Sequence, residues 1–465
     1  MSIETTDQAA RTGRLTGDAK SNLLGHLRNG KAKRDAVRKP ISGKPKPQRS
    51  RPVPSFADLD EFKQIQLQTT AAGLLGIDNP FFRPHDGKAG ATTQIDGTEY
   101  VNFASYNYVD LNGHPQITEA VKAAVDQYGI SASASRVVAG ERPIHREFED
   151  ELAKFYGVES AVVFVSGHAT NVSTIGHLMG SEDLILHDAY IHNSIVVGTQ
   201  LSGAHRISFP HNDLDALERM LSEHRDNYRR VLVVVEGLYS MDGDFPDLRR
   251  LVELRRRFGV WLMVDEAHAL GVVGDTGRGL AEHYDVDPTE VDIWMGTLSK
   301  TLSGCGGYIA GTQALTDILK ASAPGFVYSV GIPPAIAAAG LASLKLLQQE
   351  PERVSKLQHN GRYFVEQATK AGLDVAECMG YAVVPVIVGD SLRATVLSNK
   401  LLERGINALP IIHPAVPEKM ARLRFFLTSA HTEEQIALAV RVVAEEMQKL
   451  EESNFSLASA ASALG

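Results

Sequence analysis

Short apolar runs alternate with helix-like stretches through the middle of the chain. The runs are AVVFVS (161–166), DLILHD (183–188), HRISFP (205–210), VLVVVEG (231–237), WLMVDEA (261–267), DIWMGTLS (292–299) and GGYIAG (306–311). Val, Ile and Leu follow one another with little polar interruption, which is typical of strands buried on both faces. The pattern predicts an α/β protein with a mostly parallel sheet between helices, and such sheets bind ligands beyond the carboxyl ends of their strands.

The segments on either side of this region follow other patterns. SFADLDEFKQIQ, from Ser55, begins with a helix cap and continues with a helical period, and YVNFASYNYVDL has the pattern of a strand that enters a loop. After Pro333 an Ala- and Leu-rich helix leads to VVPVIVGD and ARLRFFLTSAHTEEQIALAVRVVAEEM, which mix strand and helix periods. We therefore expect a smaller C-terminal α+β domain.

Charge is divided unevenly along the chain. The formal net charge is −9, but residues 1–51 hold 13 Lys and Arg against 4 Asp and Glu, so the remainder is strongly acidic. An acidic body has no electrostatic surface for a phosphate backbone, and we expect no nucleic-acid partner for it. The Pro-, Gly- and Lys-rich segment through residue 55 is expected to be a disordered basic extension, with an Arg-rich transit peptide as the alternative.

The cysteines and the hydropathy indicate a reducing, aqueous environment. Neither of the chain's two cysteines, Cys305 and Cys378, has the paired spacing of a metal or redox motif. No run approaches the roughly 20 apolar residues that span a bilayer, and the first residues lack the apolar stretch of a secretory signal. We expect a cytoplasmic protein without a metal site and without stable membrane insertion.

Two short motifs suggest enzyme classes that the remaining sequence does not support. DEAH (265–268) is the tetrapeptide of a class of nucleic-acid-dependent NTPases, but the chain contains no G-x-x-x-x-G-K-[ST] loop for the phosphates. GDSL (389–392) matches the nucleophile box of a hydrolase class, yet it lies late in the chain and predicts an ordinary turn between a strand and a helix.

A carboxylate, a histidine and a lysine follow the strand ends in a more informative arrangement. Asp265 closes the run WLMVD, His268 follows three residues later, and Lys300 stands in GTLSKT after the next run. A buried lysine of lowered pKa can form a Schiff base with an aldehyde, and a carboxylate can keep a pyridine nitrogen protonated. These are the requirements of pyridoxal phosphate (PLP), whereas a surface charge is the alternative for either residue alone.

Longer motifs in the same order resemble the α-oxoamine synthases, PLP enzymes of the aspartate-aminotransferase-like fold (fold type I). The resemblance covers roughly residues 60–450 and rests on SRVVAGERPIHREFEDELAKFYG, HDAYIHNSIVVG, VEGLYSMDGDFPDL, VDEAHALGVVGDTGRG, GTLSKTLSGCGGYIAG and ARLRFFLTSAHTEEQI. With the patterns above, it implies an extension (1–55), an N-terminal segment (56–104), a large cofactor-binding domain (105–335), a small C-terminal domain (336–450) and a tail (451–465).

The resemblance also implies roles for individual residues. Those acting on the cofactor ring would be Lys300 as the Schiff-base lysine, Asp265 at the pyridine nitrogen, His268 at the phenolic oxygen and His192 stacked on the ring face. Those binding the phosphate would be Ser166, Gly167, His168, Thr297 and, from the neighbouring subunit, Ser329. Ser240 and Glu236 would support the ring and the histidines. The active site would therefore lie at the interface of a homodimer.

Two further residues would bind the substrate. The resemblance implies that Arg424, the second arginine of RLRF, clamps the substrate carboxylate bidentately and that Asn107 in SYNY assists it. The alternating pattern alone favours another interpretation, in which Arg422 and Arg424 are outward positions of a strand and pair with surface acids.

Two departures from the family's usual sequence lie where substrate would be accommodated. Ala132 and Ala134 stand in GISASASRVV, where the family has a glycine-rich stretch, and YVDL (108–111) replaces Tyr-Leu-Gly-Leu. The alanine methyl groups are expected near the substrate. These departures leave the identity of the amino acid and of the acyl chain open.

The activity implied by the resemblance is that of an acyltransferase. A small α-amino acid would condense with an acyl thioester of coenzyme A or of a carrier protein, lose carbon dioxide and give an α-amino ketone. SYNY is similar to the serine palmitoyltransferase branch, while LPIIHPAVP and ARLRFFLTSAHT are similar to the 8-amino-7-oxononanoate synthase branch. The rival functions are an aminotransferase of the same fold and a nucleic-acid-binding protein acting through the basic tail.

Overall fold

The structure, a computed structural model, describes residues 53–74, 76–417 and 419–453. The chain divides into two compact units, Met1–Leu67 and Gln68–Gly465. A short 3-10 helix, η1 (Phe56–Asp58), lies in the first unit and precedes α2 (Asp60–Leu74), within which the boundary between the units falls. The Ser55 hydroxyl accepts the Ala57 N–H at 3.2 Å, so the helix cap expected at Ser55 is confirmed.

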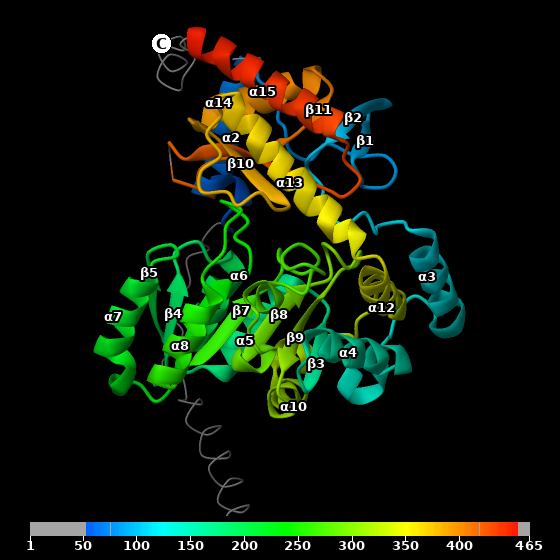
Figure 1. Ribbon diagram of the computed structural model, residues 1–465, viewed down its shortest axis with the longest axis vertical. Coiled ribbons are helices and arrows are strands. Elements are labelled where there is room, and N and C mark those ends of the chain that lie inside the picture. Colours follow the sequence, from blue (N-terminus) through cyan, green and yellow to red (C-terminus); the bar gives the residue numbers. More distant parts are fainter. Residues whose placement is uncertain (1–52, 75, 418, 454–465) are drawn as a thin grey trace, which may run out of the picture. The chain divides into compact units, whose positions relative to one another are not determined.

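A seven-stranded sheet forms the centre of the second unit (Figure 1). The strand order is β3-β9-β8-β7-β6-β4-β5. β9 runs antiparallel to both of its neighbours, and the other adjacent pairs are parallel. The strands are β3 (Ser160–Phe164), β4 (Leu184–Asp188), β5 (His205–Phe209), β6 (Val231–Glu236), β7 (Trp261–Asp265), β8 (Ile293–Thr297) and β9 (Gly307–Gly311). All seven apolar runs form these strands, and the expected mostly parallel sheet is confirmed.

In the inner strands of this sheet, alternate residues are buried on opposite faces, whereas the edge strand β5 is mostly exposed. In β6, Val233 and Val235 join one core, and Leu232 and Val234 join the other. The first core also contains residues of α4 (Pro143–Tyr156), α7 (Leu214–His224), α8 (Leu248–Phe258) and α12 (Pro334–Gln349), and the second contains residues of α5 (Gly167–Leu178), α6 (Asn193–Ser202), α10 (Gln313–Ser322) and α11 (Pro324–Val327). Helices on both faces explain why the runs lack polar alternation.

Two smaller sheets lie outside the seven-stranded sheet, and one of them combines strands from early and late parts of the chain. One sheet, in the order β10-β13-β12, is antiparallel, and the other has the order β1-β2-β11. Their strands are β1 (Thr92–Ile95), β2 (Thr98–Asn102), β10 (Val383–Gly389), β11 (Ile406–Asn407), β12 (Leu409–Ile411) and β13 (Ala421–Phe426). The remaining helices are α3 (Pro115–Tyr128), η2 (Arg136–Gly140), η3 (Arg225–Asn227), α9 (Leu280–Tyr284), η4 (Pro288–Glu290), α13 (Glu352–Lys370), α14 (Ser391–Glu403) and α15 (Glu433–Glu452). The residue-level domain boundaries stay a prediction.

The GDSL box lies at the start of α14. The Asp390 carboxylate accepts the Arg393 N–H at 2.9 Å and so caps the helix. The prediction of an ordinary turn between a strand and a helix is confirmed.

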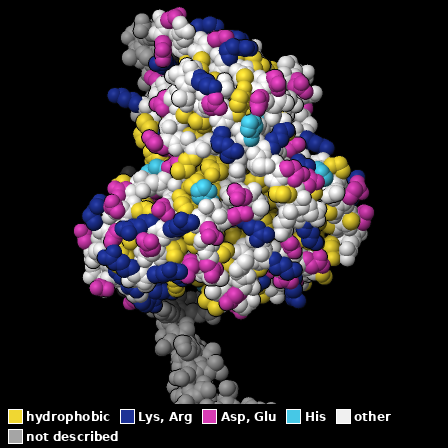
Figure 2. All heavy atoms as spheres, in the orientation of Figure 1, with side chains coloured by type: hydrophobic (Ala, Val, Ile, Leu, Met, Phe, Trp, Pro, Cys, Tyr) yellow, Lys and Arg dark blue, Asp and Glu magenta, His cyan; other side chains and the backbone are white. Residues whose placement is uncertain are grey.

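The charged surface offers no basic stripe at the arginine-rich helix α8. Arg250 and Arg257 both pair with Glu218, and Arg256 pairs with Glu290. Figure 2 shows acidic and basic side chains interspersed over the visible face. None of the helices in the described ranges has the length and apolar character needed to cross a bilayer.

Candidate active site

Polar residues gather where the parallel strands of the large sheet end. β6 ends at Glu236 and β7 at Asp265, which are register partners, and β8 ends at Thr297. A cavity of about 510 Å³ lies beside these three residues. It is lined by every predicted site residue except Asn107 and Ser329, namely Ser166, Gly167, His168, His192, Glu236, Ser240, Asp265, His268, Thr297, Lys300 and Arg424.

Lys300 lies in this cavity three residues after the end of β8. Burial lowers the pKa of its amine to about 8, although Asp265 and Glu236 act in the opposite direction. The amine lies 5.6 Å from the centre of the Tyr106 ring. A buried amine with a lowered pKa is available in its neutral, nucleophilic form close to neutral pH, as an attack on an aldehyde requires.

Asp265 presents a firmly held carboxylate to the cavity. Its Oδ1 accepts the Ala267 N–H at 3.0 Å, and its Oδ2 accepts the Asn171 side-chain N–H at 2.9 Å. Beside it, burial and the proximity of Asp265 raise the pKa of Glu236 well above its usual value. The Glu236 carboxyl accepts the His192 backbone N–H, which acts on this pKa in the opposite direction. The arrangement supplies a single oriented acceptor for a protonated ring nitrogen.

His268 is held in place by Tyr108. The Tyr108 hydroxyl lies 2.7 Å from His268 Nδ1. Burial raises the pKa of Tyr108 and lowers the pKa of His268, with Lys300 adding to the second effect, so a neutral phenol faces a neutral imidazole. In the tautomer whose proton lies on Nε2, the phenol donates to Nδ1 and His268 presents an N–H donor, as binding to a phenolic oxygen would require.

The N-terminus of α5 forms another side of the cavity. Ser166 caps the helix by accepting the Ala169 N–H at 3.4 Å, and the free N–H groups of a first helical turn favour an anion. A Cβ atom at Gly167 would lie only 2.7 Å from Thr297 Oγ1, so a side chain would fill this cradle. Thr297 Oγ1 itself donates to the Gly306 carbonyl at 3.0 Å. The donor set fits a phosphate, and together with Lys300 and Asp265 it fits PLP.

Arg424 is a buried cation without a carboxylate partner. Its Nη1 donates to the Ser240 carbonyl at 3.2 Å, its Nε has no hydrogen-bond partner, and burial lowers its pKa. Its guanidinium lies 4.6 Å from the centre of the Phe426 ring. Within the described ranges no ion pair involves this guanidinium, which leaves it free to bind a substrate carboxylate.

Arg422, two residues earlier on β13, has a different environment. It is 2% exposed, forms an ion pair with Asp242, and donates to the Met241 carbonyl at 3.0 Å. The interpretation from the alternating pattern, in which both arginines pair with surface acids, is therefore wrong. Both side chains point into the protein. The loop that carries Ser240 and Asp242 supplies an acid to Arg422 but only a backbone carbonyl to Arg424.

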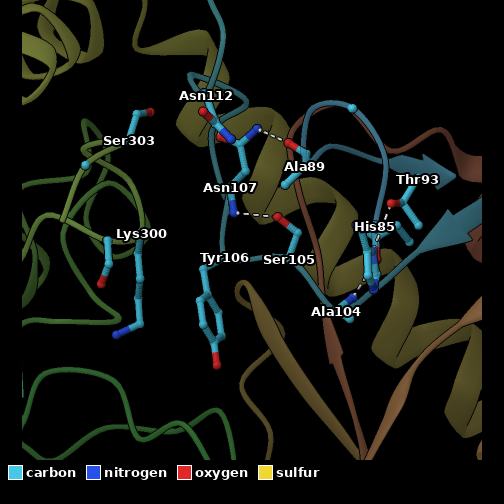
Figure 3. A pocket seen from close by; sticks show the side chains of 14 residues that line it. His85, Ala89, Thr93, Ala104, Ser105, Tyr106, Asn107, Asn112, Lys300 and Ser303 are labelled. Atoms are coloured by element: carbon cyan, nitrogen blue, oxygen red, sulfur yellow. Dashed lines mark hydrogen bonds between the residues drawn. The ribbon is translucent and has the colours of Figure 1, made fainter. Parts of the chain in front are cut away.

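Asn107 lies in a neighbouring pocket of about 530 Å³, which meets the cavity at Tyr106, Ser299 and Lys300 (Figure 3). The side-chain groups of Asn107 are engaged within the loop. Its Nδ2 donates to the Ala89 carbonyl at 2.9 Å, and its Oδ1 accepts the backbone N–H groups of residues 111 and 112. Its role at the substrate carboxylate stays a prediction.

Ser329, Ala132 and Ala134 line neither the cavity nor the neighbouring pocket. Ser329 is partly exposed and does not line the cavity of its own chain. Ala132 is 1% exposed and faces Gly331, where a Cβ atom would lie 3.2 Å from the alanine methyl group. The Ala134 carbonyl accepts the Gly331 N–H at 2.9 Å. Neither alanine lines the cavity of its own chain, and both contact the segment that carries Ser329, so the expectation that their methyl groups lie near the substrate stays a prediction.

Two residues of the site were missed at the level of sequence. Tyr108 stands beside the predicted Asn107 in SYNY, and Asn171 lies in SGHATN, within the first turns of α5. Their partners His268 and Asp265 are 160 and 94 residues away in the chain. The local sequence offers only the presence of polar residues near a strand end as a signal.

Comparison with known proteins first defines the class. The chain belongs to the aminotransferase class I and II family, whose model matches residues 98–443. It is 40% identical to the 8-amino-7-oxononanoate synthase of Symbiobacterium thermophilum, over 77% of this chain and 90% of the relative, and 39% identical to that of Geobacter sulfurreducens, over 77% and 91%. Within the family these relatives are α-oxoamine synthases, and this chain is likewise a PLP-dependent acyltransferase.

Solved structures support the same placement. A serine palmitoyltransferase of Sphingomonas wittichii matches with a TM-score of 0.81 at 29% identity, covering 85% of this chain and 99% of that one. The 8-amino-7-oxononanoate synthase of Francisella tularensis matches with a TM-score of 0.65 at 27% identity, covering 75% and 98%. The predicted fold type I and the predicted cofactor are confirmed, while the roles of single residues stay predictions.

Proposed function

We propose that the cavity around Lys300 condenses a small α-amino acid with an acyl thioester and releases carbon dioxide, giving an α-amino ketone. The observation that carries this proposal is the meeting of a lysine of lowered pKa, the Asp265 carboxylate and the unpaired Arg424 in one cavity. Bound PLP supplies an aldehyde for the amino group and a ring that accepts electrons from the α-carbon.

Each of four cavity residues has a separate role in the proposed reaction. Arg424 binds the carboxylate of the amino acid, so that the α-carbon is held at a fixed distance from Lys300. Lys300 Nζ accepts the α-proton. Asp265 keeps the proton on the ring nitrogen, and His268 donates from Nε2 to the phenolic oxygen. The attack on the thioester and the loss of the carboxylate then occur in a site closed from one side by Tyr106.

The substrates proposed are alanine and an acyl group that ends in a carboxylate. The product in the relatives' name, 8-amino-7-oxononanoate, carries a methyl group on its amino carbon and a carboxylate at the far end of its chain. A condensation of this type makes it from alanine and a seven-carbon ω-carboxyacyl thioester. The pocket beside Lys300 is lined with Asn and Ser side chains, which suit a polar chain end better than a long alkyl chain.

A product screen tests the function. The PLP-loaded protein is incubated with glycine, alanine or serine and with an ω-carboxyacyl or a palmitoyl thioester, and carbon dioxide, free thiol and amino ketone are measured. We expect all three in equal amounts, with the highest kcat/KM for alanine and the ω-carboxyacyl group. Formation of a keto acid without consumption of thioester would instead identify an aminotransferase.

A homodimer is the second part of the proposal. Five exposed apolar side chains lie near the Ser329 segment and near η2: Ile130, Val137, Val138, Tyr328 and Val330. An exposed apolar group of this kind is typical of a protein interface. We propose that it contacts a second copy of the chain and brings each Ser329 to the phosphate end of the neighbour's cavity.

Replacing Val138 with aspartate is expected to weaken the dimer, because the substitution buries an unpaired charge in the interface. Light scattering after gel filtration should show a dimer for the unchanged chain and a concentration-dependent monomer for Val138→Asp, with weaker retention of PLP. Ile318→Asp, on the exposed side of α10, is the control and should remain dimeric. A monomer in the unchanged protein would contradict the proposal.

A further inference from the structure

A chain of hydrogen bonds connects Asp265 with His192 inside the protein. The Asn171 side-chain nitrogen donates to Asp265 Oδ2 and to Ser194 Oγ, each at 2.9 Å. Ser194 Oγ lies 2.7 Å from His192 Nδ1. Asn171 is 1% exposed and Ser194 is fully buried, so water does not compete for these bonds. The two residues link two groups that both line the cofactor cavity.

The direction of each bond follows from donor chemistry. Asp265 Oδ2 accepts, so the amide of Asn171 must turn its nitrogen rather than its oxygen toward it. The second hydrogen of that nitrogen occupies a lone pair of Ser194 Oγ, and the hydroxyl proton is then free to point at His192 Nδ1. The Ser194 backbone N–H also points at this Nδ1, at 3.3 Å. Nδ1 therefore accepts two bonds, and the ring proton lies on Nε2.

Two glycines permit this arrangement by letting α5 and α6 approach closely. A Cβ atom at Gly198 would lie 3.0 Å from the Asn171 carbonyl oxygen, and one at Gly176 would lie 2.8 Å from the Leu201 side chain. The start of α6, with His192 and Ser194, can thus reach Asn171 on α5.

We propose that Asn171 and Ser194 are positioning residues that hold His192 neutral, with its proton on Nε2, and at the same time orient the Asp265 carboxylate. The effect of a neutral His192 on the reaction rests on the proposed function, in which His192 stacks on the cofactor ring. A neutral ring in that position leaves the positive charge on the pyridine nitrogen beside Asp265, where it withdraws electrons from the reacting carbon.

The tautomer can be measured without cofactor or substrate. In the protein labelled with ¹⁵N-histidine, the shifts of the His192 ring nitrogens, assigned with His192→Gln, report where the proton lies. We expect the Nε2–H form in the unchanged protein and a mixture of tautomers, with a higher His192 pKa, in Ser194→Ala and Asn171→Leu. The charged or titratable groups that face His192 are Asp265, Lys300, His168, Arg424 and Glu236, and all are kept in these variants.

A second readout is taken on the PLP-loaded enzyme. Both variants should lower kcat by about 10- to 100-fold and shift the pH profile of the visible cofactor band, as loss of an orienting partner does. Ser202→Ala is the control, since this serine lies on the same helix and its hydroxyl contacts only nearby backbone: it donates to the Thr199 carbonyl and accepts the Ala204 N–H. This variant should change neither readout. A thermal unfolding measurement on Asn171→Leu shows whether a change in the His192 tautomer or in kcat comes from misfolding. Ser194→Ala removes only one oxygen atom, so misfolding is not expected in that variant. An unchanged His192 tautomer in both variants overturns the inference, even if the product screen succeeds.

Discussion

Replacing Lys300 with alanine is expected to lower amino-ketone formation by at least about 10³-fold, since the variant loses both the amine that captures the cofactor and the acceptor of the α-proton. The fold should persist, because among the residues that the structure describes the Lys300 amine forms neither a hydrogen bond nor an ion pair, and the backbone bond from Ser303 N–H to the Lys300 carbonyl is kept in the variant. The measurement is product formation in the screen above, together with absorbance before and after borohydride reduction. Reduction should attach the cofactor to Lys300 in the unchanged protein, as peptide mass mapping would show, and to no residue in Lys300→Ala.

A surface lysine provides the control for this experiment. Lys122 is exposed and pairs with Glu119 on α3, so Lys122→Ala should retain full activity and the same reduced peptide. If Lys300→Ala made ketone at a rate comparable with the unchanged protein, the assignment of Lys300 would be wrong.

The same lysine predicts a pH dependence for capture of the cofactor. Burial lowers the Lys300 pKa from its ordinary value to about 8. Below that pH the ammonium form predominates and cannot attack an aldehyde, so the rate of PLP binding to the cofactor-free protein should rise as pH passes through 8 and then level off. Stopped-flow absorbance at several pH values tests this. A midpoint near 10.5 would show that the amine is solvated.

Replacing Arg424 with alanine is expected to lower kcat/KM for the amino acid by about 100-fold or more, because it leaves the substrate carboxylate buried without its cationic partner. Arg424→Lys should recover little of the lost kcat/KM, since an ammonium group cannot form the two parallel hydrogen bonds of a guanidinium. Steady-state kinetics with alanine varied at saturating thioester measures the effect. The change should appear mainly in KM, because the carboxylate is bound before the chemical steps.

Two comparisons separate this effect from a loss of structure. Alaninamide, which lacks the carboxylate, should inhibit the unchanged enzyme and Arg424→Ala equally well. Arg404→Ala, which removes a surface pair with Glu445 and Glu446, should leave kcat/KM unchanged. Arg422→Ala should instead lower the unfolding temperature, because it leaves Asp242 without its buried partner. Equal loss of alanine and alaninamide binding in Arg424→Ala would contradict the carboxylate role.

The central sheet and the cofactor lysine could be predicted from the sequence because their signals are local. A strand buried on both faces must be apolar along its whole length, so each of the inner runs can be recognised as a strand from its own residues. Polar residues at the ends of such runs, Asp265 and Thr297 among them, must lie at the edge of the sheet. The long motifs of the resemblance then narrow the chemistry to PLP.

Which polar residues meet was not predictable in the same way, because the partners are far apart in the chain. Arg422 and Arg424 share a face of β13, and alternation places them identically. Arg422 nevertheless pairs with Asp242, while Arg424 forms no ion pair with any residue that the structure describes, and its Nε has no hydrogen-bond partner there. The loop from Ser240 to Asp242 makes the difference, and nothing in RLRF specifies where that loop lies. The opposite holds for Asn107: it was predicted to bind the substrate, but its side chain forms hydrogen bonds to the nearby backbone instead.

The sequence by itself determined the type of fold, the strands and the residue types at their ends, since apolar burial and strand length are properties of short segments. Only the tertiary structure decided the strand order with β9 antiparallel, the contact of His268 with Tyr108, and the network from Asp265 through Asn171 to His192. These features depend on distances between segments brought together by packing. No local pattern of residues carries that information.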